Sequence, residues 1–283
     1  MKNHIRLLAI DIDGTLLDSH FEVSDANREA IAAAHARGVE IVVVTGRRFA
    51  FAQPIAAQLG VELTLIASNG AVVKSQQGAT LARQLLPREK ARAVLGAAGE
   101  ARETALLLFD REGMGQVVVE RMDPAHAPVE GYFERNRTYL LQVKRLEEAL
   151  SEDPIQVLFA GPVAPLRELY ERLSRSEHAA EVSLARAEYP QRDLTLLDVL
   201  DRGCNKGAAL ARWAAERGIA ASETMAIGDN WNDCEMLEFA GLPVLMGNSA
   251  AELKQRGWAV TASNEESGVA AAIEMFVLRD SDH

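Results

Sequence analysis

The chain of 283 residues is long enough for two domains and a substantial apolar core. Its 48% hydrophobic and 25% charged residues are ordinary for a globular protein, and no uninterrupted apolar run approaches the ~20 residues of a membrane span. The net charge of −11 argues against nonspecific binding to nucleic acids or membranes, and no signal peptide is recognisable, so we expect a cytoplasmic protein.

The cysteines and histidines give no sign of a disulfide framework or a zinc site. Cys204 and Cys234 are the two cysteines, and they are far apart and form no CxxC pair. The six histidines show no HxH or HExxH spacing. A metal site, if the protein has one, is therefore expected to use oxygen ligands.

The first predicted strand ends at two carboxylates. Leu7 to Ile10 is an apolar run typical of a buried parallel strand, and Asp11 and Asp13 follow it, with Ile12 between them pointing back to the core. Ligands of open α/β sheets bind beyond the carboxyl ends of the strands. Two neighbouring carboxylates repel each other, which favours a bound cation such as Mg²⁺.

A second strand repeats this pattern. Ser24 is a candidate N-cap for a helix that ends near Gly38, and an apolar strand over 39–44 then ends at Thr45-Gly46-Arg47. A hydroxyl and a glycine N–H group suit a phosphate oxygen. A plain helix start, capped by the threonine, is the alternative reading of this triplet.

The next elements extend the same fold. We expect a helix over 48–59, disturbed near Pro54, a strand over 63–67, a turn at 68–70 and a hairpin over 71–82. The order β-α-β-α-β is that of a doubly wound sheet.

From residue 83 the pattern changes to that of a separate α+β insert. Helical stretches at 87–102, 143–150 and 163–177 alternate with strand candidates at 104–110, 115–120, 155–160 and 194–199, and 123–138 reads as a loop. None of these strands ends in a phosphate-type signature.

The last part of the chain returns to the first pattern. A turn at 203–207 leads into a helix over 208–217, and Lys206 lies in the first turn, where an anion is favoured. A strand over 224–228 then ends at Asp229, with Asn232 and Asp233 close behind. A helix over 231–240, strands at 243–246 and 259–260 and a helix over 268–278 are expected to complete the sheet.

Four of these segments together resemble the haloacid dehalogenase superfamily of aspartyl-nucleophile phosphatases, in its Cof-like branch. They are DIDGT at 11–15, VVTGR at 43–47, Lys206 before a helix, and GDNWND at 228–233. The resemblance implies an α/β fold with a doubly wound, mostly parallel, Rossmann-like sheet. Residues 1–82 and 194–283 would form the catalytic core, and 83–193 an inserted α+β cap domain that selects the substrate.

The resemblance also implies roles for the polar residues. Asp11 would be the nucleophile and Asp13 the general acid and base, and Mg²⁺ would be held by Asp11, Asp13 and Asp229, supported by Asp233. The positions expected to bind substrate are Ile12, Thr45, Gly46, Arg47, Lys206 and Asn232. For Arg47, an orientation toward substrate and a surface ion pair are equally open.

The expected function is that of a Mg²⁺-dependent phosphatase that hydrolyses small phosphorylated metabolites, with sugar phosphates as the expected class, through an aspartyl-phosphate. We expect no nucleic-acid or membrane partner and a monomer or homodimer. A phosphotransferase or phosphomutase would share the same motifs. A phosphorylatable signalling module is the other alternative, although Asp13 argues against it because it retains the acid/base needed for hydrolysis.

Overall fold

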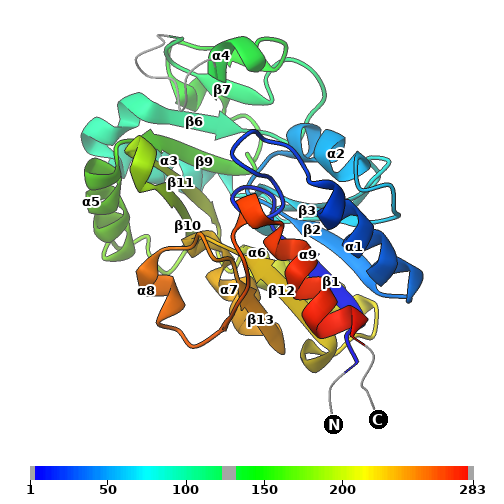
Figure 1. The fold of residues 1–283 in the computed structure, drawn as a ribbon. Helices are drawn as coiled ribbons and strands as arrows, with labels where there is room; N and C mark the ends of the chain where they lie inside the picture. Colours follow the sequence, from blue (N-terminus) through cyan, green and yellow to red (C-terminus); the bar gives the residue numbers. More distant parts are fainter. Residues whose placement is uncertain (1–3, 123–131, 280–283) are drawn as a thin grey trace. The chain divides into compact units, whose positions relative to one another are not determined.

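The computed structural model describes residues 4–122 and 132–279 and divides the chain into two compact units. The first unit consists of residues 1–83 and 205–283, and the second of residues 84–204. Figure 1 shows the helices and strands of each unit, coloured by their position in the sequence.

The first unit is built on an eight-stranded sheet in the order β14-β13-β12-β1-β2-β3-β4-β5. Six strands run parallel: β1 (Leu7–Ile10), β2 (Glu40–Val44), β3 (Thr64–Ala67), β12 (Thr224–Gly228), β13 (Leu242–Leu245) and β14 (Ala259–Val260). Antiparallel strands β4 (Val72–Ser75) and β5 (Thr80–Arg83) form one edge. The expected doubly wound, mostly parallel sheet is confirmed.

Helices cover both faces of this sheet, which explains its unbroken apolar strands. Leu8 and Ile10 of β1 belong to a hydrophobic cluster with residues of α1 (Asp25–Ala36), α2 (Phe49–Ala57) and α9 (Gly268–Ile273). Leu7 and Ala9 belong to the cluster on the other face, with residues of α6 (Lys206–Glu216), α7 (Cys234–Phe239) and α8 (Ala251–Lys254).

Two local expectations for these helices have different outcomes. Ser24 caps α1 as predicted, since its side chain accepts a hydrogen bond from the Asn27 N–H group. The expected disturbance at Pro54 is wrong, because α2 continues through it from Phe49 to Ala57. Proline has no N–H group, so the carbonyl four residues before Pro54, in the first turn of the helix, receives no hydrogen bond from it. The rest of the helix keeps its hydrogen bonds.

The second unit is an α+β unit with a six-stranded sheet in the order β10-β11-β9-β6-β7-β8. Its strands are β6 (Ala105–Leu108), β7 (Val117–Val119), β8 (Leu140–Gln142), β9 (Gln156–Gly161), β10 (Val182–Tyr189) and β11 (Leu194–Asp201). The helices α3 (Arg88–Ala97) and α5 (Val163–Ser174) contribute to a hydrophobic cluster with strand residues such as Leu107 and Phe159. Within the loop expected over 123–138, residues 132–135 form the short helix α4 (Tyr132–Arg135), and residues 123–131 lie outside the described part of the chain.

The boundary after the insert differs from the expected one. We expected the core to resume at residue 194, but β11 pairs antiparallel with both β9 and β10 and so belongs to the second sheet. The first unit resumes at Asn205. The ends of the insert are joined, because the Gln84 side chain donates to the Arg202 carbonyl at 2.8 Å and to the Asp201 carboxylate at 3.0 Å.

Within residues 4–122 and 132–279, no helix is both long enough and apolar enough to cross a bilayer.

Candidate active site

Three neighbouring strands of the first unit end at the same edge of the sheet. β1 lies between β2 and β12 and pairs parallel with both. Asp11, Thr45 and Asp229 directly follow β1, β2 and β12, and the Asp11 N–H group continues the ladder by donating to the Ile227 carbonyl at 3.0 Å. The early strands β2 and β3 extend the sheet on one side of β1, and the late strands β12 and β13 extend it on the other side. The strand order therefore reverses at β1, and the polar groups gather at the place where an open α/β sheet binds ligands.

Lys206 joins two of the buried acids. Its Nζ atom lies 2.6 Å from Oδ1 of Asp11 and 2.6 Å from Oδ1 of Asp233, and the lysine is only 1% exposed. Asn205 fixes the start of its helix, because its side chain accepts a hydrogen bond from the Ala208 N–H group at 2.7 Å. The lysine is therefore held within the acid cluster.

The acid cluster has an excess of negative charge. Carboxylate oxygens of Asp11, Asp229 and Asp233 lie within 4.8 Å of one another, and all three residues are buried. Burial and the charge of Asp233 raise the pKa of Asp11 to about 7, although Lys206 opposes the shift. Burial and the two neighbouring carboxylates likewise raise the pKa of Asp229 well above its usual range. Burial lowers the pKa of Lys206, but Asp11 and Asp233 raise it by more, so the lysine stays charged.

These groups fit a divalent cation with a preference for oxygen ligands. With all three carboxylates ionised, they and the one ammonium would leave a buried charge of −2, which is costly without a counterion. An all-carboxylate donor set suits Mg²⁺ rather than a soft metal. Because both oxygens of Asp233 already have partners, Asp11 and Asp229 are the better candidates for direct ligands.

Asp233 organises the loop behind this cluster. Its Oδ2 atom accepts hydrogen bonds from the N–H groups of Asp229 at 2.9 Å and Asn230 at 3.0 Å. Asp229 is held from the other side by Thr15, whose hydroxyl donates to it at 2.9 Å. Gly14 allows this approach: its φ is +78°, and a Cβ atom there would lie 2.4 Å from Oδ2 of Asp229.

The loop after β2 rests on a neighbouring turn. Residues 68–70 have φ values of 50°, 53° and 100°, so three consecutive residues are in the left-handed region. Asn69 donates from its N–H group to the Thr45 carbonyl at 3.0 Å and accepts from the Asn232 side chain at 3.0 Å. A Cβ atom on Gly46 would lie 3.2 Å from Oδ1 of Asn69. Asn69 thus joins two of the expected substrate-binding positions, a role that sequence reasoning missed.

Arg47 pairs with Asp13. The Nε and Nη2 atoms of Arg47 lie 2.7 Å and 2.6 Å from the two carboxylate oxygens of Asp13. Of the two orientations left open for this arginine, the structure shows an ion pair, but with the expected acid/base residue. Ile12, in contrast, is fully buried in the core, so only its main chain could meet a ligand.

Two segments of the C-terminal part of the chain, one after β13 and one after β14, hold the segment that follows Asp13. The Asn248 side chain donates to the Gly14 carbonyl at 2.8 Å and accepts from the Asn264 N–H group at 3.1 Å. The Asn264 side chain donates to the Leu17 carbonyl at 2.9 Å. Sequence reasoning assigned these asparagines no role, because the contacts join residues more than 200 positions apart.

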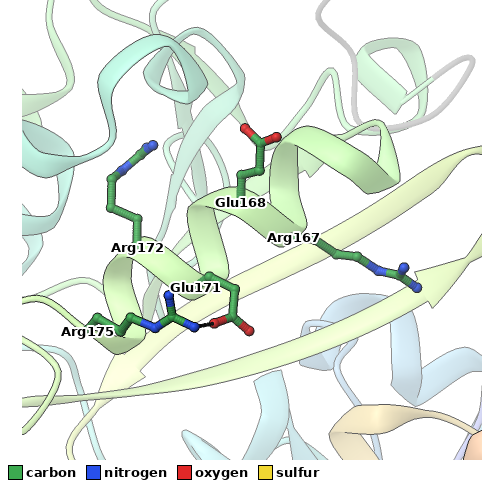
Figure 2. A pocket seen from close by; sticks show the side chains of 5 residues that line it. All are labelled: Arg167, Glu168, Glu171, Arg172 and Arg175. Carbon is green, nitrogen blue, oxygen red and sulfur yellow. Dashed lines mark hydrogen bonds and ion pairs between the residues drawn. The ribbon is translucent and has the colours of Figure 1, made fainter.

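A hollow of about 410 Å³ in the second unit is a poor candidate for the reaction site. Figure 2 shows its lining side chains, of which four come from α5 and the last directly follows it: Arg167, Glu168, Glu171, Arg172 and Arg175. Arg175 pairs with Glu171, and Arg172 donates to the Ala98 carbonyl. We therefore place the site at the acid cluster of the first unit, where buried charges gather.

Comparison with known proteins identifies the family. A family model described as haloacid dehalogenase-like hydrolase matches residues 8–273. The chain belongs to the haloacid dehalogenase-like hydrolases. The resemblance that the four motifs indicated is therefore confirmed, and the fold with it.

Two curated relatives and one solved structure illustrate the match. The chain is 31% identical to the phosphatase YwpJ of Bacillus subtilis over 94% of this chain and 98% of the relative. It is 35% identical to the HMP-PP phosphatase of Serratia proteamaculans over 88% and 86%. A haloacid dehalogenase-like hydrolase from B. subtilis is similar in structure, with a TM-score of 0.78, 26% identity and coverage of 96% and 100%. This protein is thus a phosphomonoester hydrolase of the Cof-like branch.

Proposed function

We propose that this hydrolase is a Mg²⁺-dependent phosphatase of small phosphorylated metabolites, with sugar phosphates as the expected class, and that it works through an aspartyl-phosphate on Asp11. The observation that carries the proposal is the buried cluster in which Lys206 contacts Asp11 and Asp233 at 2.6 Å each. The names of the relatives from B. subtilis and S. proteamaculans support a phosphorylated compound as the substrate.

In the first half-reaction, a carboxylate oxygen of Asp11 forms a bond to phosphorus while the bond from phosphorus to the ester oxygen breaks. Asp13, as a carboxylic acid, gives its proton to the leaving oxygen, so the alcohol departs neutral. Lys206 offsets the charge that would otherwise repel an anionic nucleophile from a phosphate. Its ammonium is already in place beside Asp11.

In the second half-reaction, water attacks the phosphorus of the aspartyl-phosphate and the bond to Asp11 breaks. Asp13, now a carboxylate, accepts a proton from that water, which returns both acids to their starting states. Inorganic phosphate is the product.

The phosphoryl oxygens would be held by groups from two loops and α6. Thr45, the Gly46 N–H group, Lys206 and Asn232 offer donors at the carboxyl ends of β2 and β12 and at the start of α6. Mg²⁺, held by the carboxylates of Asp11 and Asp229 and the main-chain carbonyl of Asp13 with support from Asp233, would supply positive charge to the phosphoryl group.

The direct test is release of inorganic phosphate from a panel of phosphorylated metabolites, with and without Mg²⁺, by the parent protein and by Asp11→Asn and Asp13→Asn. We expect metal-dependent turnover that Asp11→Asn abolishes, and a ranking within the panel that identifies the substrate class. A labelled phosphoryl group that passes to a sugar acceptor instead of water would point to a transferase. A stable phosphorylated Asp11 without turnover would point to a signalling module.

A further inference from the structure

We infer that Arg47 is a positioning residue that aims the carboxyl group of Asp13 at the leaving-group oxygen, rather than a ligand of the substrate phosphate. The inference rests on the proposed function, in which Asp13 protonates that oxygen. On this inference, Arg47 affects the cleavage of the bond from phosphorus to the ester oxygen. An experiment can separate this effect from an effect on substrate binding.

The geometry of the pair carries the argument. Two nitrogens of one guanidinium contact the two oxygens of one carboxylate, at 2.7 Å and 2.6 Å. A two-point contact between planar groups fixes the direction of the carboxyl plane as well as its position. A lysine in the same place would offer one point charge and leave the carboxyl group free to rotate.

Asp13 needs such a contact because its own surroundings hold it loosely. The side chains of Asp13 and Arg47 are 30% and 26% exposed, whereas Asp11, Lys206 and Asp233 are almost fully buried. A half-buried acid that directly precedes a glycine has several accessible rotamers, and a misdirected acid is costly in proton transfer. Arg47 supplies the constraint that burial supplies to the other acids.

Arg47 is itself fixed at its backbone. Its N–H group donates to the Thr45 hydroxyl at 3.1 Å, and its carbonyl accepts from the Ser68 N–H group at 2.9 Å. The guanidinium therefore extends from a fixed point between β2 and the turn at 68–70. It meets Asp13 with both a terminal nitrogen and Nε, so this edge of the guanidinium faces the acid.

Leaving groups of different acidity separate positioning from substrate binding. An alkyl phosphate needs a proton on its leaving oxygen, while p-nitrophenyl phosphate releases a stable phenolate and needs none. The ratio kcat/KM reports the steps up to formation of the aspartyl-phosphate, in which the two substrates differ. The limiting kcat also includes hydrolysis of that intermediate, which is common to both.

The experiment measures kcat/KM of the parent, Arg47→Met, Arg47→Lys, Asp13→Asn and the double variant Arg47→Met/Asp13→Asn on p-nitrophenyl phosphate and on the best alkyl phosphate of the panel. We expect both Arg47→Met and Asp13→Asn to lose at least about tenfold more on the alkyl phosphate than on the aryl phosphate. Arg47→Lys should recover only part of the difference. In the double variant the loss should equal that of Asp13→Asn alone, because Arg47 acts through that acid.

Arg217→Met is the matched control. Arg217 also pairs with a carboxylate, Glu40, at 3.0 Å, but it lies at the end of α6. Its removal should change the two kcat/KM values by the same factor. Circular dichroism and thermal unfolding of each variant separate loss of fold from loss of positioning.

Two results would overturn the inference. Equal losses on both substrates in Arg47→Met would show that the arginine binds the phosphate that they share. A double variant whose loss is the product of the two single losses would show that Arg47 acts independently of Asp13. A parent protein that turns over neither substrate would instead contradict the proposed function, so the two failures are distinguishable.

Discussion

The ammonium group of Lys206 lies 2.6 Å from the carboxylate of Asp11, at a point where both side chains are removed from water. An ion pair in such a place is stabilising only while both partners are present, because desolvation of a lone buried charge is costly. The acid cluster is therefore the feature whose changes have the largest expected effects.

Removal of the buried lysine should affect both activity and stability. Lys206→Met leaves three buried acids without their cation, so we expect a loss of roughly 10²-fold or more in kcat and about 3–5 kcal/mol in the free energy of unfolding without metal. Phosphate release and denaturant unfolding measure the two effects. The control is Lys90→Met, whose partly exposed pair with Asp201 should cost at most about 1 kcal/mol. Similar losses in the two variants would contradict the assignment of Lys206.

Stability should depend on pH and on metal in a coupled way. The unfolded chain releases the Asp11 proton near the ordinary pKa of 3.8, but the folded metal-free protein keeps it until about pH 7. Because the folded state binds more protons between these values, the metal-free protein loses stability as the pH rises through this window. Mg²⁺ binds the deprotonated acids, so the gain in Tm on adding Mg²⁺ should grow between about pH 5 and about pH 8. Calorimetry at several pH values measures this gain, and a constant gain would argue against a metal at these acids.

Gly70 should tolerate no side chain. Its φ is +100°, and a Cβ atom there would lie 2.4 Å from the carbonyl oxygen of Asn205, which directly precedes Lys206. Gly70→Ala should therefore lower both Tm and kcat. Gly38→Ala is the control, since Gly38 has a φ of +83° but no atom within 4 Å of such a Cβ, and only the backbone strain of roughly 1–2 kcal/mol applies. If both variants keep full activity, the turn at 68–70 has no influence on the lysine.

Asn69 should act on substrate binding through Asn232. Asn69→Gly keeps the left-handed backbone accessible and removes the amide that accepts from Asn232 at 3.0 Å. Loss of one such hydrogen bond, about 1 kcal/mol, corresponds to about a fivefold loss in kcat/KM. Asn232→Ala alone and in combination gives the test, because a shared effect makes the double variant little worse than Asn232→Ala. Fully additive losses would show that the two asparagines work separately.

The central strands and their acids could be predicted because they follow from local patterns. Unbroken apolar runs indicate buried parallel strands, and the residues that follow neighbouring strands must meet at one edge. Asp11, Thr45 and Asp229 therefore came together as expected, although their catalytic roles stay predictions. The cytoplasmic location and the oligomeric state also stay predictions.

What the sequence could not indicate depends on pairing between distant segments. β10 mixes polar and apolar residues and β8 has only three, so neither gave a recognisable pattern. The expected boundary at residue 194 assigned β11 to the core, although the strand pattern grouped 194–199 with the insert, because a strand sequence does not specify its partners. The pairing of Arg47 with Asp13, and of Asn69 with Asn232, likewise depends on side-chain geometry that appears only once the chain is folded.

The hydrogen bonds of Gln84 to Asp201 and Arg202 have a consequence for how this chain can diverge. They join the two ends of the insert. The first unit is therefore connected to two chain ends that lie side by side, and not to a long flexible loop whose closure would cost entropy. The side chains proposed to act in catalysis and in metal binding all belong to the first unit. The segment 84–204 can therefore be exchanged as a cassette, by recombination or by engineering, provided that the replacement also has adjacent ends and keeps the Asn205 cap that sets Lys206 in place.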